Sequence, residues 1–267
     1  TPLFIFAATA CRFVEDYRQG GGPDDRLQKI LQYEARGNFD QTYLPALNQM
    51  IHGLKGSARR NAISEFNLIV GSIVTLTNPL AAAPLASLLG ISTECVNNRL
   101  QLLHSVLDIP TDTTAPVRIF HESFRDFLIR PDPEDVHEFW VDEKAIHKTL
   151  ADRCLRLLSE DGYLKKDICG LGAPGKSRTI LDQQTIDRHL PSEARYACLY
   201  WVHHLKGSVV TIDDEHQALQ FLQRHFLHWL EALSLMGRIS ESIRLIEKLQ
   251  GLVNVSYFYD HTDIFMC

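Results

Sequence analysis

The segment PLASLLGISTECVNNRLQLLHSVL, residues 84–107, contains two short apolar helical patterns separated by a glycine. The leucines between residues 85 and 89 share one helical face, and Gly90 is the residue type at which helices commonly end. Ser92 or Thr93 can cap the second helix, because a side-chain hydroxyl accepts hydrogen bonds from the unpaired N–H groups of a helix start. Two short helices around a glycine-containing turn predict a helix-turn-helix.

The sequence on both sides of this segment completes the pattern of a winged helix. Residues 60–77 show a helical pattern that an Asn-Pro pair closes, since the residue before a proline is disfavoured in a helix. TDTTAP at 111–116 has the composition of a loop and would form the wing, and VRIFHESFRDFLIR at 117–130 indicates a strand that leads into a helix. We therefore predict a winged-helix domain over residues 57–131.

The residues before this domain, 1–56, are predicted to form a helical subdomain. Residues 1–14 are nearly all apolar, which indicates a buried strand or helix. From residue 26 onward, leucines, isoleucines and a methionine recur at spacings of three and four, the pattern of amphipathic helices.

The residues after the winged helix, 132–267, are predicted to form an α-helical arm. PDPED at 131–135 has the composition of a linker. Amphipathic patterns then predict four helices, over about 142–159, from 192, over about 215–236 and from 240. Trp201 and Trp229 fall on the apolar faces of two of these helices, so we interpret both as packing residues. The predicted fold class is therefore mainly α.

Composition excludes several classes of function. The 267 residues carry a formal charge of −6, whereas a strong nucleic-acid binder needs a basic excess. The six cysteines are scattered and form no C-x-x-C pair, which indicates buried thiols in a reducing compartment and neither a disulfide framework nor a zinc site. No apolar run approaches the roughly 18 residues of a membrane span. We therefore expect a cytoplasmic protein without membrane or nucleic-acid partners, and the initial threonine indicates a piece of a longer chain.

GLGAPGKS at residues 170–177 matches the phosphate-binding pattern G-x-x-x-x-G-K-[ST]. Such a loop works when an apolar strand delivers it and a helix begins at the Lys-Ser pair, so that backbone N–H groups point at phosphate. Here the charged sequence YLKKDIC precedes the loop, and RTILDQQTID follows it without a helical stripe. Pro174 also stands where the backbone normally donates a hydrogen bond. We predict a surface loop without ATPase or GTPase activity, so the chain itself is expected not to be an enzyme.

HESFRDF at residues 121–127 contains the residue types of a hydrolase triad, His121, Ser123 and Asp126. Within a helix, side chains two positions apart point away from each other, which disfavours that triad. The phenylalanines from position 120 onward are predicted to form the apolar stripe, leaving His121 and Arg125 together on another face. For His121, a partly exposed helix residue and a phosphate contact both remain open.

Two histidine pairs, His203-His204 and His225-x-x-His228, have a residue type that binds metals. Neither pair has an acidic residue or a cysteine at ligand spacing, and His204 falls on an apolar helix face. We therefore predict no metal site.

DNA binding by the winged helix, as in a transcription regulator, is the alternative function. Its second helix carries one arginine, Arg99, against Glu94 and Asp108, and phosphate contacts supply much of the affinity for DNA. Asn97 and Asn98 could read adenine bases. The charge pattern favours a module that contacts protein.

Three stretches in this order resemble fungal STAND-class NTPases: PLFIFAATACRFVED (2–16), VRIFHESFRDFLI (117–129) and ARYACLYWVHHL (194–205). These are large NACHT-domain proteins, many ending in WD repeats, and they include heterokaryon-incompatibility proteins. The resemblance covers about residues 1–250. It implies that the phosphate-binding loop and the acidic strand that binds Mg²⁺ lie upstream, and that residues 1–56 contain the end of the NACHT core with its helical subdomain.

The resemblance also implies two site residues. In NOD-like relatives, a histidine in an H-x-S-F motif contacts the β-phosphate of ADP and locks the closed state, and His121 with Ser123-Phe124 matches it. Pro2 matches the proline that packs on adenine in related proteins. The fragment would hold no cofactor itself, while its parent would bind ADP or ATP with Mg²⁺, GTP remaining open. The implied partners are the upstream NACHT core, downstream WD repeats or another sensor, and further copies upon activation; residues after about 253 differ from those expected before WD repeats.

Overall fold

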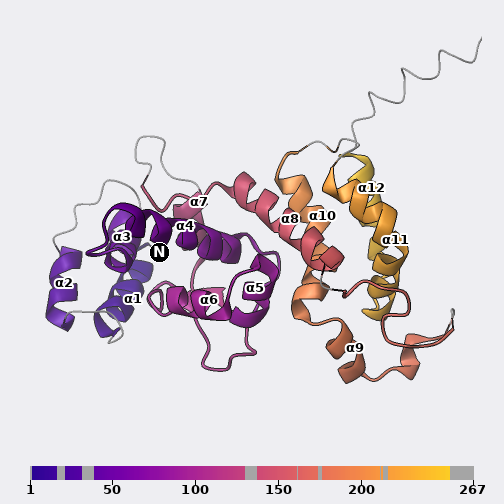
Figure 1. Cartoon of the computed structure of the whole chain (residues 1–267). Coiled ribbons are helices and arrows are strands. Elements are labelled where there is room, and N and C mark those ends of the chain that lie inside the picture. The colour runs from indigo at the N-terminus through magenta and orange to yellow at the C-terminus, as the bar shows by residue number, and fades with distance from the viewer. Residues whose placement is uncertain are drawn as a thin grey trace, which may run out of the picture. The chain divides into compact units, whose positions relative to one another are not determined.

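The computed structural model of the chain describes residues 2–16, 22–31, 39–129, 137–160, 162–173, 176–210, 212 and 216–252, without the side chains of residues 2–4. This part of the chain is mainly helical, as predicted (Figure 1). It divides into two compact units, an N-terminal unit of residues 1–146 and a C-terminal unit of residues 147–267. The predicted boundary between residues 56 and 57 lies inside the N-terminal unit and remains a prediction. The linker-like residues 131–135 lie outside the described residues.

The N-terminal unit begins with three helices that pack against one another, α1 (Pro2–Glu15), α2 (Pro23–Leu31) and α3 (Asp40–Met50). The apolar start of the chain is thus a helix, which settles the choice between strand and helix. The last carbonyl groups of a helix lack intrahelical partners. The buried Arg26 of α2 fills this need at the end of α1, because its Nε and Nη2 donate to the Val14 carbonyl at 3.0 and 2.7 Å.

The predicted helix-turn-helix is present. It follows α4 (Gly56–Thr75) and consists of α5 (Ala82–Leu89) and α6 (Thr93–Leu100), and α6 packs on both other helices. Gly90 ends α5 with a φ of +64°, a conformation that costs glycine little. Ser92 caps α6, since its hydroxyl oxygen accepts from the N–H of Cys95 at 3.1 Å.

Two short strands follow, β1 (Leu107–Asp108) and β2 (Arg118–Ile119), paired antiparallel with Leu107 opposite Ile119. The predicted wing, TDTTAP, lies in the loop that joins them, where Asp112 Oδ1 accepts from the N–H of Thr114 at 2.9 Å. Helix α7 (Glu122–Ile129) follows β2, as the strand-to-helix pattern predicted. These strands and α7 follow the helix-turn-helix in the predicted order, and the assignment of residues 57–131 to a winged-helix domain remains a prediction.

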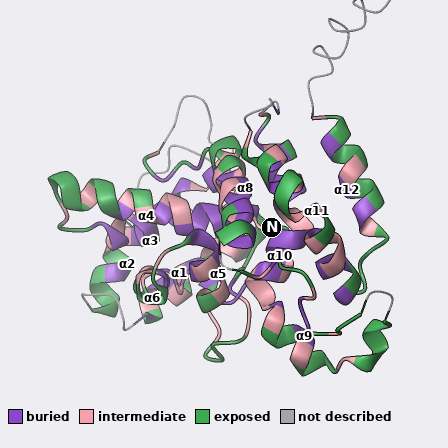
Figure 2. Ribbon diagram, turned by 45° about the vertical axis from the view of Figure 1, so that its right-hand side comes forward, coloured by how far each residue is buried: buried purple, intermediate pink, exposed green. Residues whose placement is uncertain are grey.

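The C-terminal unit contains most of α8 (Glu143–Glu160) and the further helical elements η1 (Arg178–Ile180), α9 (Gln183–His189), α10 (Ser192–Gly207), α11 (Gln217–Leu235) and α12 (Glu241–Gln250). Helices α10, α11 and α12 pack against one another. Figure 2 shows buried and exposed residues alternating along α12, as expected of a surface helix with one apolar face.

RTILDQQTID shows no apolar stripe, as expected, but it contains the 3₁₀ turn η1 and most of the helix α9, which were not predicted from the sequence. Asp182 begins α9, because its Oδ1 accepts from the N–H of Thr185 at 2.6 Å. The helix has only seven residues and buries only Ile186, so it is too short to show an apolar stripe. Its signal in the sequence is the capping aspartate.

The core of the C-terminal unit contains both tryptophans, as predicted. Trp201 and Trp229 are fully buried, and their rings meet edge to face with centroids 5.6 Å apart. Trp229 Nε1 donates to the Cys198 carbonyl at 2.9 Å, so burial does not leave the indole N–H unpaired. Among the described residues, no helix combines the length and the apolar character needed to cross a membrane.

Candidate functional site

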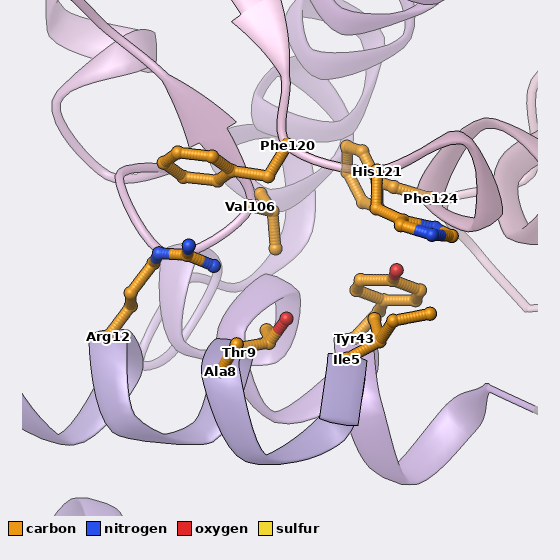
Figure 3. A pocket seen from close by; sticks show the side chains of 9 residues that line it. All are labelled: Ile5, Ala8, Thr9, Arg12, Tyr43, Val106, Phe120, His121 and Phe124. Carbon is orange, nitrogen blue, oxygen red and sulfur yellow. The ribbon is translucent and has the colours of Figure 1, made fainter. Parts of the chain in front are cut away.

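His121 lines a cavity of about 100 Å³ in the N-terminal unit (Figure 3). Helix α1 contributes Thr9 and Arg12 to its wall, α3 contributes Tyr43, and the junction between β2 and α7 contributes Phe120 and His121. The cavity thus joins the first and second of the three stretches on which the family resemblance rests.

His121 stands immediately before α7 and is exposed. Its Nδ1 accepts from the backbone N–H of Ser123 at 3.1 Å and lies 2.8 Å from Ser123 Oγ. The expectation that these two side chains point apart was therefore wrong. It holds inside a helix, whereas His121 lies outside α7 and satisfies one of the unpaired N–H groups of its first turn.

A chain of hydrogen bonds continues from His121 into the core. Ser123 Oγ lies 2.7 Å from the hydroxyl of Tyr43, and both residues are buried. Burial raises the pKa of Tyr43, so its phenol keeps its proton and can donate toward Ser123. Because His121 Nδ1 accepts from a backbone N–H, the neutral imidazole carries its proton on Nε2. Tyr43 and Ser123 therefore orient His121 as an Nε2–H donor.

The same contacts argue against a hydrolase. Ser123 is only 6% exposed, and its hydroxyl lies between a phenol and an imidazole. A nucleophilic serine must reach a substrate carbonyl, which this position prevents. The hydrolase interpretation is thus disfavoured by burial of Ser123 and not by its separation from His121.

Phe120 and Arg12 form the other end of the cavity. Phe120 is 42% exposed, and the Arg12 guanidinium carbon lies 3.9 Å from its ring centroid, a cation–π contact. The prediction that Phe120 belongs to the apolar stripe was wrong, because the residue precedes α7. Phe124 and Phe127 are buried as predicted.

Arg125 has a structural role and does not extend the site. Its Nε donates to the Val74 carbonyl at the end of α4 at 3.0 Å, and its Nη2 contacts Glu143 Oε1 at 2.5 Å. Arg12 and His121 are the basic side chains that line the cavity. Pro2 is the first residue of α1, and its side chain lies outside the described residues, so its proposed contact with adenine remains a prediction.

Two backbone amides of the GLGAPGKS loop are occupied by a side chain of the protein itself. Asp167 accepts from the N–H groups of Leu171 and Gly172, at 2.6 Å through Oδ1 and 2.8 Å through Oδ2. A phosphate-binding loop offers amides of this kind to its ligand, and here a carboxylate already holds them. Lys176 Nζ donates to the Leu171 carbonyl at 2.7 Å.

The surroundings of the loop also differ from those of a phosphate site. Residues 166–169, just before it, form turns, and no strand delivers the described part of the loop. Ser177 caps the 3₁₀ turn η1 through the N–H of Thr179, so no α-helix begins at the Lys-Ser pair. Pro174 and Gly175 lie outside the described residues.

The structure weakens the DNA-binding alternative. Arg99 Nη2 contacts Glu65 Oε2 at 2.5 Å, and the arginine side chain is only 12% exposed. An arginine that is half-buried and paired contributes little to phosphate binding. The second helix of the helix-turn-helix thus uses its one arginine to hold α4.

A comparison with curated proteins finds the vegetative incompatibility protein HET-E-1 of Podospora anserina, 25% identical over 278 aligned residues. The alignment covers 94% of this chain and 19% of HET-E-1, so the chain spans about a fifth of that relative's length. No protein-family model and no solved structure matches the chain. The alignment supports a distant relationship between this chain and one segment of a fungal incompatibility protein.

Proposed function

We propose that this chain is the regulatory segment of a nucleotide-switched signalling NTPase of the fungal incompatibility type. The observation that carries the proposal is the exposed His121, held by Ser123 and Tyr43 with Nε2 as its donor. An imidazole fixed in this way can donate to a phosphate oxygen, and such a bond to a charged acceptor is stronger than one between neutral groups.

The size of the cavity indicates how nucleotide would be bound. Sites that enclose a small ligand measure about 300–1,000 Å³. The cavity beside His121 measures about 100 Å³, which is too small for ADP. His121 would therefore reach a nucleotide that another domain holds, and the family resemblance proposes an upstream NACHT core with Mg²⁺ for that role.

A switch requires that the contact differ between two states, since a ligand shifts an equilibrium only through its differential affinity. We propose that His121 bonds the terminal phosphate of ADP in the resting state and loses that bond when ATP alters the phosphate geometry. Loss of the bond would free the winged helix to rotate and the protein to assemble. The name of HET-E-1 supports the incompatibility context, and we place the protein in the cytoplasm, leaving open which sensor follows.

We expect His121→Ala to release ADP about 10–100-fold faster, because a hydrogen bond to a charged group contributes about 1.5–3 kcal/mol. The protein that carries this chain together with its nucleotide-binding core is loaded with fluorescent ADP, and dissociation is followed after addition of unlabelled ADP. His52→Ala is the matched control, because His52 is an exposed histidine of the same unit and does not line the cavity. Equal release rates for the two variants would contradict the proposed phosphate contact.

A further inference from the structure

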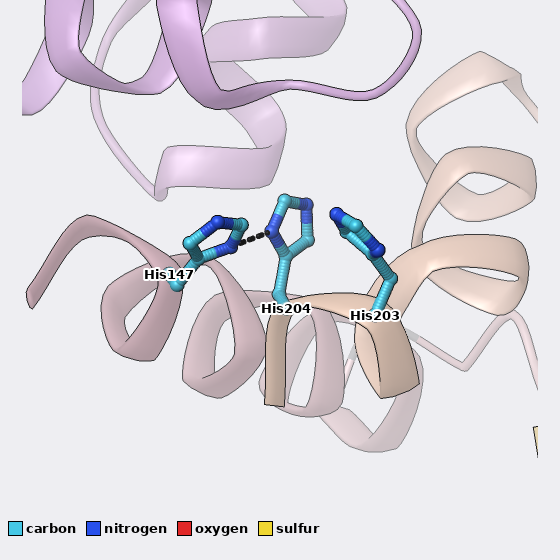
Figure 4. A group of neighbouring side chains, drawn as sticks. All are labelled: His147, His203 and His204. Atoms are coloured by element: carbon cyan, nitrogen blue, oxygen red, sulfur yellow. Dashed lines mark hydrogen bonds between the residues drawn. The ribbon is translucent and has the colours of Figure 1, made fainter. Parts of the chain in front are cut away.

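Three histidines of the C-terminal unit converge, although His147 lies far in the sequence from the adjacent pair His203 and His204 (Figure 4). His147 lies on α8, and His203 and His204 lie on α10. One ring nitrogen of each lies within 4.8 Å of the others, and the Nδ1 atoms of His147 and His204 are 2.8 Å apart. The partner that the His203-His204 pair lacks in its own helix is thus supplied 57 positions away by α8.

His204 is held in one orientation. It is fully buried, and its Nε2 lies 2.7 Å from the hydroxyl of Tyr196, which lies on the same helix. With the ring proton on Nε2 and donated to Tyr196, Nδ1 presents its lone pair toward His147. Histidines that bind metals commonly have their second nitrogen bonded in this way, which fixes the tautomer and the ring orientation.

Gly207 of α10, which has no side chain, leaves space for the ring of His147. A Cβ atom at Gly207 would lie 2.6 Å from the imidazole of His147, too close for the ring to stay in place. Gly207 therefore makes room for His147 beside His204. His203 is exposed, which leaves the cluster a route for an ion and a place for water.

We propose that His147, His203 and His204 bind a divalent transition-metal ion, with Zn²⁺ as the probe. Three imidazoles without a carboxylate or thiolate suit Zn²⁺, Cu²⁺ or Ni²⁺ and not Mg²⁺ or Ca²⁺. Zn–N bonds of 2.0–2.1 Å in a tetrahedral site place the nitrogens about 3.3 Å apart. The His147–His204 pair would open slightly, His203 would close on the ion, and water would complete the coordination.

Binding replaces the proton that the two Nδ1 atoms now share. That proton belongs to His147 and moves to Nε2 of the same ring. Both imidazoles therefore stay neutral, and the Nδ1 atoms of His147 and His204 each give a lone pair to the ion. Lys206 and Lys248 lie near His203 and would repel a dication, so we expect weaker binding than in a structural site with four protein ligands.

The test is a titration of the whole chain, first stripped with a chelator, with Zn²⁺ by calorimetry and with Co²⁺ by visible absorption. We expect one ion per chain, Co²⁺ bands typical of tetrahedral coordination, and a thermal midpoint that rises with Zn²⁺ concentration. His203→Ala should lower the affinity at least tenfold, and because this residue is exposed, the variant should fold. Tyr196→Phe should lower the affinity about tenfold, as loss of a partner that orients a ligand does.

His189→Ala is the matched control, since His189 lies on α9 and is not one of the three clustered histidines. It should bind Zn²⁺ as the unaltered chain does. Absence of Zn²⁺ and Co²⁺ binding by the unaltered chain would overturn the proposal, and so would equal affinity in His203→Ala and His189→Ala.

Discussion

Trp229→Ala should lower the free energy of unfolding of the C-terminal unit by about 3–5 kcal/mol, the range measured when a large aromatic residue is removed from a core. Trp229 is fully buried against Trp201. Its removal leaves a cavity and also leaves the Cys198 carbonyl without the indole N–H that it accepts at 2.9 Å. Both effects act in the same direction.

The same helix supplies a control for this prediction. Leu227 lies two residues away on α11 and is 74% exposed, so Leu227→Ala should change the free energy of unfolding by less than about 0.5 kcal/mol. Urea denaturation followed by far-UV circular dichroism gives both values. A loss of less than 1 kcal/mol in Trp229→Ala, or similar losses in the two variants, would contradict the packing described for this unit.

Cys198 should react with iodoacetamide about 1,000-fold more slowly than an ordinary thiol at pH 8 while the chain is folded. The thiolate is the reactive form, and burial raises the pKa of Cys198 to about 12. An ordinary thiol has a pKa of about 8.5, so its thiolate fraction at pH 8 is about 10³ times larger. Burial also raises the pKa of Cys154, which is fully buried in the same unit and should be protected as well.

Mass spectrometry of peptides after timed labelling measures this protection. Cys11, on α1, is exposed and serves as the internal reference. Addition of urea should make Cys198 and Cys154 reactive together, because both become exposed when the C-terminal unit unfolds. Labelling of Cys198 at the rate of Cys11 in the folded chain would show that α10 is not buried as described.

Much of the fold could be predicted because its signals are local. Gly90 and Ser92 determine where two helices end and begin, and both act through backbone groups within four residues of themselves. The tryptophans could be assigned to the core because helical spacing placed them on apolar faces. Helix α9 was missed because seven residues with one buried side chain carry no periodicity, although Asp182 supplied a capping signal.

The details of the candidate sites could not be predicted in the same way. The contact between His121 and Ser123 depends on where α7 begins. Side chains two positions apart point away from each other inside a helix, but they can meet when the first of them precedes the helix. Occupation of the Leu171 and Gly172 amides by Asp167 depends on a turn with a φ of +58° at that aspartate. The pairing of His147 with His204 is a tertiary contact between helices, which spacing within one helix does not reveal.

The proposed function requires that the chain sense nucleotide through His121 and not through the GLGAPGKS loop. The most direct test measures the ADP that remains bound when the protein containing this chain and its nucleotide-binding core is purified as His121→Ala and as Lys176→Ala. We expect His121→Ala to retain much less ADP than the unaltered protein, and Lys176→Ala to retain as much, because Lys176 already donates to the Leu171 carbonyl. Loss of ADP in Lys176→Ala with full retention in His121→Ala would contradict this claim.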